Sequence, residues 1–239
     1  GGATDQQIAA QAYNKVIRKM ADRPESAIYH LRNFNNWVKA TSIQALYDIT
    51  ARHGPRGGGG GGAAPGEEAE DEEIPLRGLS VLDLGCGKGG DIGKWAKHRL
   101  GIYRYVGVDI AHESLKDFTG RVAGNPRLPA DRVRLGWADP GKQDLVNDAI
   151  QVWDAAGGWR EGAALAAEQA GTFDAASLQF SLHYFLESRG RLRALLRNAA
   201  SALRPGGHLL ATTVDARVLA ELLAGHAEEE EAEGAAKRE

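Results

Sequence analysis

A glycine-rich turn in the first half of the chain is the clearest candidate for chemistry. It reads Gly85-Cys-Gly-Lys-Gly-Gly90 and follows a short apolar segment, Ser80–Leu84. A turn of this kind between a strand and a helix lets the backbone approach a nucleotide-like ligand closely. This turn lacks the Gly-Lys-Ser/Thr ending of a phosphate-binding P-loop, which excludes that class of nucleotide site.

The residue that discriminates between ligands is Asp83, two positions before the first glycine. A dinucleotide would place its pyrophosphate over the turn, and a carboxylate in contact with it would oppose binding by about 4 kcal/mol in an intermediate dielectric. The ammonium and sulfonium of S-adenosylmethionine would instead be attracted, although Lys88 offsets part of this charge. We therefore expect Asp83, Gly85 and Gly87 to bind S-adenosylmethionine, and a nicotinamide oxidoreductase is the least favoured alternative.

Two further carboxylates follow predicted strands. Asp109 ends the segment 105–109, where a carboxylate accepts hydrogen bonds from ribose hydroxyls, with a helix cap or turn residue as the alternative. Asp139 follows the segment 133–137 and suits the adenine amino group, but an ordinary Asp-Pro turn is almost as good an interpretation. Cys86 is the only cysteine, which excludes an intrachain disulfide and argues against a Cys-based zinc site. We interpret it as a small turn residue, and we expect no metal.

Alternating strands and helices must position these residues. We expect strands at 80–84, 105–109, 133–137, 173–180 and 208–214, and helices at about 91–99, 114–122, 143–168 and 188–203. This alternation predicts an α/β fold with a parallel, doubly wound sheet.

The chain divides into four parts by composition. Residues 1–52 read as a helical segment, with a first helix capped by Asp5 and a second over 26–50. Residues 53–75 contain six consecutive glycines and read as a low-complexity flexible insertion, and 224–239 as an acidic, disordered tail. Residues 76–223 form the expected Rossmann-like domain.

The charge of the chain is unevenly distributed. The whole chain carries −3, whereas the acidic run at 67–73 carries −6 and the tail from 227 onward carries −4, so the remainder carries +7. A basic body favours an anionic partner. The sequence has no apolar run of about 18 residues, and we expect neither a membrane span nor a signal peptide.

Three motifs together resemble the eukaryotic mRNA cap guanine-N7 methyltransferase family. They are the N-terminal segment 31–40, the cofactor loop 81–91 and the segment 179–188 that follows the fourth predicted strand. The turn at 203–207 and the segment 212–215 also fit. The resemblance implies a class I S-adenosylmethionine-dependent methyltransferase fold, Rossmann-like and doubly wound, that acts on the 5′ cap of RNA in the nucleus.

The resemblance also implies roles for residues at matching positions. The residues implied to contact S-adenosylmethionine are Lys39, Asp83, Gly85, Gly87, Asp109, Asp139, Gln179 and Tyr184. Those implied to contact the cap or its phosphates are Asn35, Asn36, Lys88, Lys94, Arg121 and His183, with Tyr184 beside them. From the residues alone, Asn35-Asn36 also fits a helix cap and His183 a core histidine. We expect Phe34 and Trp37 to lie in the core.

The implied reaction transfers a methyl group to guanine N7, which carries no proton, so we expect no catalytic base and no catalytic residue beyond those that orient the substrates. Two departures from the family stand out. Pro140 replaces the usual Ser, which removes one possible hydrogen bond, and we count five strands where seven are normal. We therefore expect a C-terminally incomplete sheet, without the cap-pocket glutamate and a further aromatic residue.

Alternatives of other classes remain open. The chain could be a non-catalytic cofactor- or cap-binding module, an inactive fragment of such an enzyme, or a methyltransferase for a small molecule or protein. The paired motifs Asn35-Asn36 and His183-Tyr184 argue against the last of these. Capped RNA is the expected partner, the capping apparatus and RNA polymerase II are candidate partners, and we expect a monomer.

Overall fold

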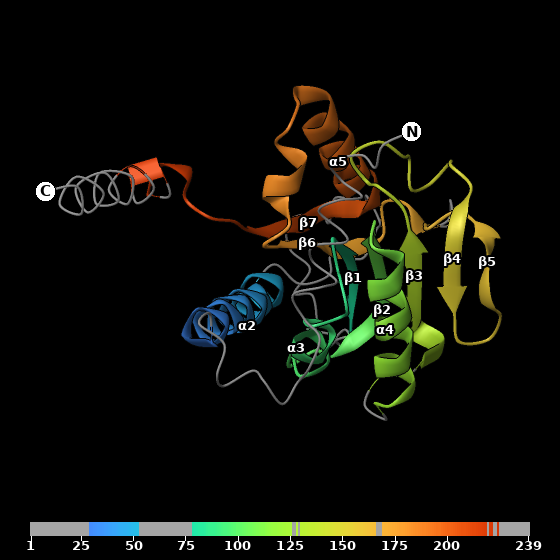
Figure 1. Cartoon of the computed structure of the whole chain (residues 1–239). Coiled ribbons are helices and arrows are strands. Elements are labelled where there is room, and N and C mark those ends of the chain that lie inside the picture. The colour runs from blue at the N-terminus through green and yellow to red at the C-terminus, as the bar shows by residue number, and fades with distance from the viewer. Residues whose placement is uncertain are drawn as a thin grey trace, which may run out of the picture.

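Seven strands form one mixed sheet (Figure 1). The computed structural model describes residues 29–52, 78–125, 128, 130–165, 169–218, 220, 221 and 224. The strands are β1 (Leu79–Leu84), β2 (Ile102–Asp109), β3 (Val133–Trp137), β4 (Ile150–Asp154), β5 (Gly158–Gly162), β6 (Phe173–Gln179) and β7 (Leu203–Thr212). Their order across the sheet is β5-β4-β3-β2-β1-β6-β7.

Helices cover both faces of this sheet. They are α2 (Tyr29–Arg52), α3 (Ile92–Ala96), α4 (His112–Ala123) and α5 (Arg189–Ala202), with short 3₁₀ turns at η1 (Ala130–Arg132) and η3 (Leu182–Phe185). Figure 1 places α2, α3 and α4 toward one side of the sheet and α5 toward the other. The predicted doubly wound α/β architecture is therefore confirmed.

The two faces follow from the alternation of side chains along buried strands. In β1, Leu82 and Leu84 belong to the core on the α5 side, together with Leu195. Val81 of the same strand belongs to the core on the other side, together with Trp95. All six residues of β1 are buried, as expected for a central parallel strand that is apolar on both faces.

The predicted helix over 143–168 is wrong. This region contains the strands β4 and β5, which pair with each other in antiparallel fashion, and β4 also pairs with β3 in antiparallel fashion. The sequence of β4 alternates between the buried Ile150 and Val152 and the exposed Gln151, which is the period of a strand, and residues 155–157 form the turn to β5. The alanines on either side of β4 and β5 suggested a helix. The pairing of β4 with the edge of β3 instead stabilises strands in this region.

The count of five strands was therefore also wrong, since the described residues contain seven. Five strands run parallel at the predicted positions, and the two additional strands extend the sheet beyond β3 rather than beyond β7. The second predicted N-terminal helix corresponds to α2. The first predicted helix, the acidic run, the insertion at 53–75 and nearly all of the acidic tail lie outside the described residues.

The expectation that Phe34 and Trp37 lie in the core is wrong. Their side chains are 59% and 62% exposed, and their rings pack on each other at 6.0 Å. The residues of α2 that enter the core are Ile43 and Leu46, one turn apart in the second half of the helix. Phe34 and Trp37 in the first half of α2 therefore lie outside the core, whereas the second half of the helix packs into it.

Candidate functional site

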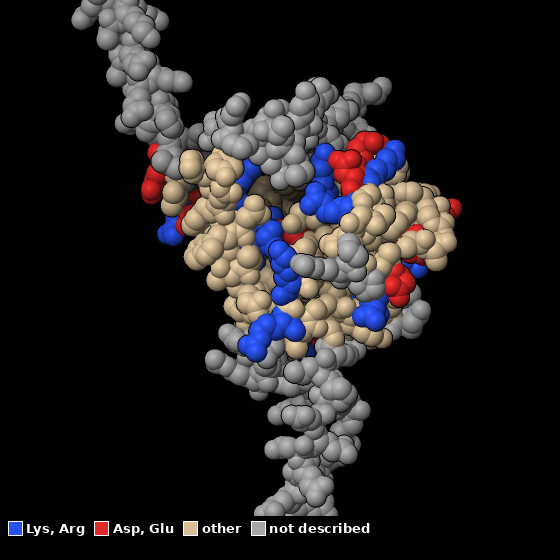
Figure 2. All heavy atoms as spheres, turned by 90° about the horizontal axis from the view of Figure 1, so that it is seen from below, with Lys and Arg blue, Asp and Glu red and all other residues tan. Residues whose placement is uncertain are grey.

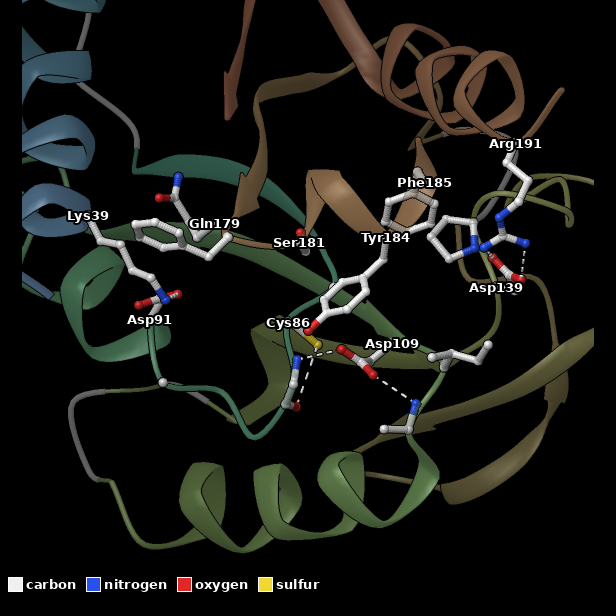
Figure 3. A pocket seen from close by; sticks show the side chains of 17 residues that line it. Lys39, Cys86, Asp91, Asp109, Asp139, Gln179, Ser181, Tyr184, Phe185 and Arg191 are labelled. Atoms are coloured by element: carbon white, nitrogen blue, oxygen red, sulfur yellow. Dashed lines mark hydrogen bonds and ion pairs between the residues drawn. The ribbon is translucent and has the colours of Figure 1, made fainter. Parts of the chain in front are cut away.

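A cavity of about 440 Å³ opens at the carboxyl ends of β1, β2, β3 and β6 (Figure 3). This is the place where open parallel sheets bind ligands, and the volume suits a molecule the size of a nucleoside conjugate. The residues that line it are Lys39, Gly85, Cys86, Gly87, Gly90, Asp91, Asp109, Ile110, Ala111, Asp139, Pro140, Gln179, Phe180, Ser181, Tyr184, Phe185 and Arg191.

The glycine-rich turn brings backbone to the wall of this cavity. Gly85 has φ +78° and Gly87 φ +52°, a conformation that favours glycine. A Cβ on Gly85 would lie 2.5 Å from the Cβ of Ser181, so this position also has no room for a side chain. The turn is fixed to β2, because the N–H of Gly85 donates to the carbonyl of Val108 at 2.7 Å.

Asp109 holds the turn from the end of β2. Its Oδ2 accepts the Gly87 N–H and its Oδ1 accepts the Ala111 N–H, both at 2.7 Å. Burial raises the pKa of Asp109, and backbone hydrogen bonds from Ala111, Gly87 and Ile110 act against that rise. A carboxylate has about four acceptor positions, so at least one remains for a ligand. The sequence left a ribose contact and a turn residue as alternatives, and the geometry accommodates both roles.

Cys86 lies beside this carboxylate. Burial, together with the charge of Asp109, raises the pKa of its thiol well above the usual value. A neutral thiol is a poor nucleophile. The interpretation of Cys86 as a small turn residue is consistent with this environment.

Asp83 lies beneath the turn and does not line the cavity. It is 2% exposed, and its Oδ2 accepts a 2.5 Å hydrogen bond from the hydroxyl of Tyr105. Burial, followed by the charge of Asp91, raises its pKa from the ordinary 3.8 to about 7. The carboxylate that faces the cavity at this end is therefore Asp91 rather than Asp83.

Lys39 and Asp91 form an ion pair at one end of the cavity (Figure 3). Lys39 Nζ lies 2.8 Å from Asp91 Oδ2, and Lys94 Nζ lies 2.7 Å from the other oxygen. Lys94 also donates to the side-chain oxygen of Asn36 at 3.1 Å. Thus Asp91 connects one residue expected at the cofactor with two expected at the cap.

Gln179, at the end of β6, presents an unpaired donor. Its Oε1 accepts the Thr212 hydroxyl at 3.0 Å, whereas its buried Nε2 has no hydrogen-bond partner among the described residues. The hydroxyl of Thr212 also accepts the N–H of Phe180, so its orientation is set from two sides. The amide of Gln179 thus has an unpaired donor in a residue that lines the cavity.

Tyr184 and His183 lie on η3, at the mouth of the cavity. Tyr184 lines the cavity and is 55% exposed, and its ring packs against that of His183 at 4.2 Å. His183 itself does not line the cavity, and burial lowers its pKa. The exposed ring of Tyr184, backed by the half-buried ring of His183, can hold a flat group.

Asp139 and Arg191 form a second ion pair at the other end of the cavity. Arg191 Nη1 lies 2.9 Å from Asp139 Oδ2, and Nη2 lies 3.1 Å from Oδ1. Oδ1 also accepts the N–H of Gly141 at 3.0 Å, which is the local turn that the Asp-Pro sequence suggested. Figure 3 shows this pair and the Lys39–Asp91 pair at opposite ends, with Asp109 and Tyr184 between them.

Several expected cap residues lie outside the cavity. Lys88 pairs with Asp117 at 2.7 Å, and neither Asn35 nor Arg121 lines the cavity. Figure 2 shows Lys and Arg side chains beside a hollow on one face of the molecule, in keeping with the basic body expected from the charge. Of the described residues that follow β7, none lines the cavity.

The sequence interpretation missed two charged residues of the cavity. The sequence position of Asp91 could have indicated a site residue, since it directly follows the glycine turn and stands three residues before Lys94. Arg191 had none, because it is one of four arginines in α5 and only the fold distinguishes it from Arg189, Arg193 and Arg197.

The described residues offer neither a cluster of metal ligands nor a helix that could span a membrane. Among the described ranges, no group of three or more His, Cys, Asp or Glu side chains could hold a metal ion. No helix within the same ranges has both the length and the apolar character needed to cross a membrane.

The sheet order, the glycine turn after β1 and the carboxylate at the end of β2 define a class I, Rossmann-like methyltransferase fold. The model of the mRNA (guanine-N(7))-methyltransferase domain matches residues 66–235, and the chain belongs to this family.

Curated relatives agree with this assignment. The chain is 32% identical to an mRNA cap guanine-N(7) methyltransferase of Aspergillus niger, over 87% of this chain and 33% of that protein. It is 32% identical to mRNA cap guanine-N(7) methyltransferase 1 of Arabidopsis thaliana, over 89% and 46%. It is 34% identical to the protein of that name in Oryza sativa subsp. japonica, over 84% and 42%. The chain thus spans less than half the length of each.

A solved structure with local similarity is an S-adenosylmethionine dependent methyltransferase from Mesorhizobium loti. It covers 56% of this chain and 46% of its own, with 28% identity and a TM-score of 0.36.

Proposed function

We propose that this chain binds S-adenosylmethionine and contributes to methylation of N7 of the cap guanine of RNA. The observation that carries the proposal is the elongated cavity, with an ion pair at each end and a carboxylate between them, in a chain of the cap methyltransferase family. Capped RNA is the proposed partner and the nucleus the proposed location. The capping apparatus and RNA polymerase II remain candidate further partners, and we propose a monomer.

The residues present fit S-adenosylmethionine. Asp109 has at least one free acceptor position for a ribose hydroxyl, and Gln179 has a buried donor without a partner among the described residues. Gly85 and Gly87 let backbone approach the ligand. Lys39 is proposed to meet the carboxylate of the methionine part and Asp139 the adenine, whereas Asp83 supports the turn from beneath.

The chemistry requires orientation rather than proton transfer. Bound S-adenosylmethionine would supply an electrophilic methyl group on a sulfonium. Guanine N7 has a free lone pair, so the chain needs no general base. Holding two reactants in line contributes roughly 7–11 kcal/mol, and the positive charge that arrives on guanine favours a polar, preorganised site. Tyr184 is proposed to contact both the cofactor and the base, because it lines the cavity and extends to its mouth.

The cap site is proposed to lie over α2 and η3, next to this cavity. His183 packs on Tyr184, and Asn36 is hydrogen-bonded to Lys94, so these four residues form two contacting pairs at the cavity mouth. Asn35, Lys88 and Arg121 are proposed to contact the cap or its phosphates from farther away.

The test is titration calorimetry of the whole chain with S-adenosylhomocysteine, then with a cap analogue, and a methyl-transfer assay on capped RNA. Asp109→Ala is expected to abolish S-adenosylhomocysteine binding, because hydrogen bonds to a charged acceptor contribute about 1.5–3 kcal/mol each. Asp117→Ala is the matched control, since this exposed carboxylate pairs with Lys88 outside the cavity.

Each outcome of that test decides between the alternatives. Binding without methyl transfer would favour the non-catalytic module or inactive fragment. Unchanged affinity in Asp109→Ala would contradict the assignment of the ribose contact. A folded chain that binds no S-adenosylhomocysteine would overturn the proposed function.

A further inference from the structure

The ion pair between Asp139 and Arg191 is unusual in being buried and at the wall of the cavity. Both side chains are 10% exposed, and the guanidinium makes two hydrogen bonds to one carboxylate. The two residues are 52 positions apart, so the fold brings them together from the loop after β3 and the first turn of α5. Because a buried ion pair adds little net stability, stability alone does not account for this pair, and its place at the cavity wall points to ligand recognition.

Most acceptor positions of the Asp139 carboxylate are occupied by donors of the protein itself. Asp139 Oδ1 accepts from Arg191 and from the N–H of Gly141, which fills its two acceptor positions. Oδ2 accepts one hydrogen bond from Arg191 and retains one position, with Lys142 Nζ 4.0 Å away. Asp139 can therefore accept one further hydrogen bond, and it can donate none.

The adenine edge needs more than an acceptor. Its amino group donates, but the adjacent ring nitrogen N1 accepts, so full pairing of this edge needs an acceptor and a donor side by side. The residue after Asp139 cannot supply the donor from its backbone, because Pro140 has no N–H. Both Pro140 and Arg191 line the cavity at this end.

Arg191 has donors left over. A guanidinium carries five N–H groups, of which two are directed at Asp139. Its Nε lies 3.4 Å from the exposed Glu187 carboxylate without hydrogen-bond geometry. Two N–H groups on Nη1 and Nη2 therefore remain on the side chain that borders the space next to Asp139.

We propose that Arg191 is a specificity-determining residue of the cofactor site. It donates to N1 of the adenine while Asp139 accepts from the amino group, and the ion pair acts as one acceptor–donor unit in place of a backbone donor. Because a guanidinium has no acceptor, the unit rejects bases that carry a proton on N1. This inference rests on the proposed binding of S-adenosylmethionine and names the group that selects its base.

The test compares S-adenosylhomocysteine with its 1-deaza analogue, in which N1 is replaced by C–H, by calorimetry on the whole chain. The 3-deaza analogue is the control ligand, since it alters the far side of the ring. The wild-type chain is expected to bind the 1-deaza analogue about 10- to 100-fold more weakly, the range for one hydrogen bond to a charged group. In Arg191→Met this penalty is expected to fall to about one- to threefold, while the penalty for 3-deaza stays unchanged.

A merely structural role predicts a different pattern, in which Arg191→Met weakens all three ligands equally and keeps the 1-deaza penalty. That result would overturn the proposal, as would a wild-type chain without a 1-deaza penalty. If Arg191→Met does not fold, Arg191→Lys decides, because it keeps a charge beside Asp139 but loses the fork. The penalty is expected to shrink there at least fivefold, and an unchanged penalty would overturn the proposal. If the folded wild-type chain does not bind S-adenosylhomocysteine at all, the proposed function is overturned, and this inference with it.

Discussion

The burial of Asp83 predicts a stability that falls as pH rises toward neutrality. Burial, followed by the charge of Asp91, raises the pKa of Asp83 to about 7, while the hydrogen bond from Tyr105 lowers it. The folded-state pKa thus lies above the unfolded value of about 3.9, so the protonated acid favours the folded state. This contribution is fully present below about pH 4 and is lost as pH rises through 7.

The magnitude follows from the difference between the two pKa values. About three units correspond to ~4 kcal/mol at full ionisation, since one unit is 1.36 kcal/mol. Integrating between the two values places about 2 kcal/mol of the loss between pH 5 and pH 7. Asp83→Asn removes the titration but keeps an oxygen that can accept the Tyr105 hydroxyl. Its advantage over the wild-type chain is therefore expected to grow by ~2 kcal/mol across that interval.

Urea unfolding of both ligand-free chains at several pH values between 5 and 7.5 measures this directly. The difference between the chains isolates Asp83, because the other titrating groups are shared. Tyr105→Phe is the companion variant, since loss of the donor raises the folded-state pKa of Asp83 further and extends the loss of stability to higher pH. Parallel stability curves for the wild-type chain and Asp83→Asn would refute the reasoning.

Two further predictions concern packing and the cap. Gly89 has φ +70° and its added Cβ would lie 2.3 Å from the ring of the buried Phe118, so Gly89→Ala is expected to cost about 2–5 kcal/mol in a thermal melt. Gly90→Ala is the control, because nothing lies within 4 Å of its Cβ, and an equal loss in both would contradict this account. His183→Ala is expected to spare S-adenosylhomocysteine binding in calorimetry and to weaken binding of a cap analogue, because His183 contacts Tyr184 but not the cavity. Equal loss of both ligands would show that His183 is structural.

The central part of the fold was predictable because its signals are local. The strand that ends at Asp83-Leu84, the glycine turn and the strand that ends at Asp109 follow from short apolar runs and from glycine spacing. The hairpin of β4 and β5 was missed for the opposite reason. Its strands are five residues each among alanine-rich neighbours, and they are stabilised by pairing with β3, which the sequence does not display locally.

Site residues were predictable where the position of a single residue at the end of a strand was enough. They were not predictable where two residues from elements far apart in the sequence come together. Asp109 and Gln179 end strands at the edge where ligands bind, so position alone made them candidates. The partner of Asp139 comes from another element 52 residues away, and a helix rich in arginine gives no indication of which side chain turns inward. Asp83 was expected at the ligand because it precedes the glycine turn in the sequence, but in the structure its side chain is buried beneath that turn.

The charges of the cavity explain why its ligand should be a zwitterion joined to a neutral base. Lys39 and Asp91 pair at one end, so an ammonium and a carboxylate arriving together can exchange with that pair without leaving a net charge. Asp139 and Arg191 at the other end suit a neutral edge that both donates and accepts. The carboxylate of Asp109 stands between them, where it can accept hydrogen bonds from ribose hydroxyls. A dinucleotide that displaced S-adenosylhomocysteine in competition calorimetry would contradict this reasoning. The charged side chains that line the cavity, Lys39, Arg191, Asp91, Asp109 and Asp139, carry a net charge of −1, so a pyrophosphate would find no excess of positive charge there.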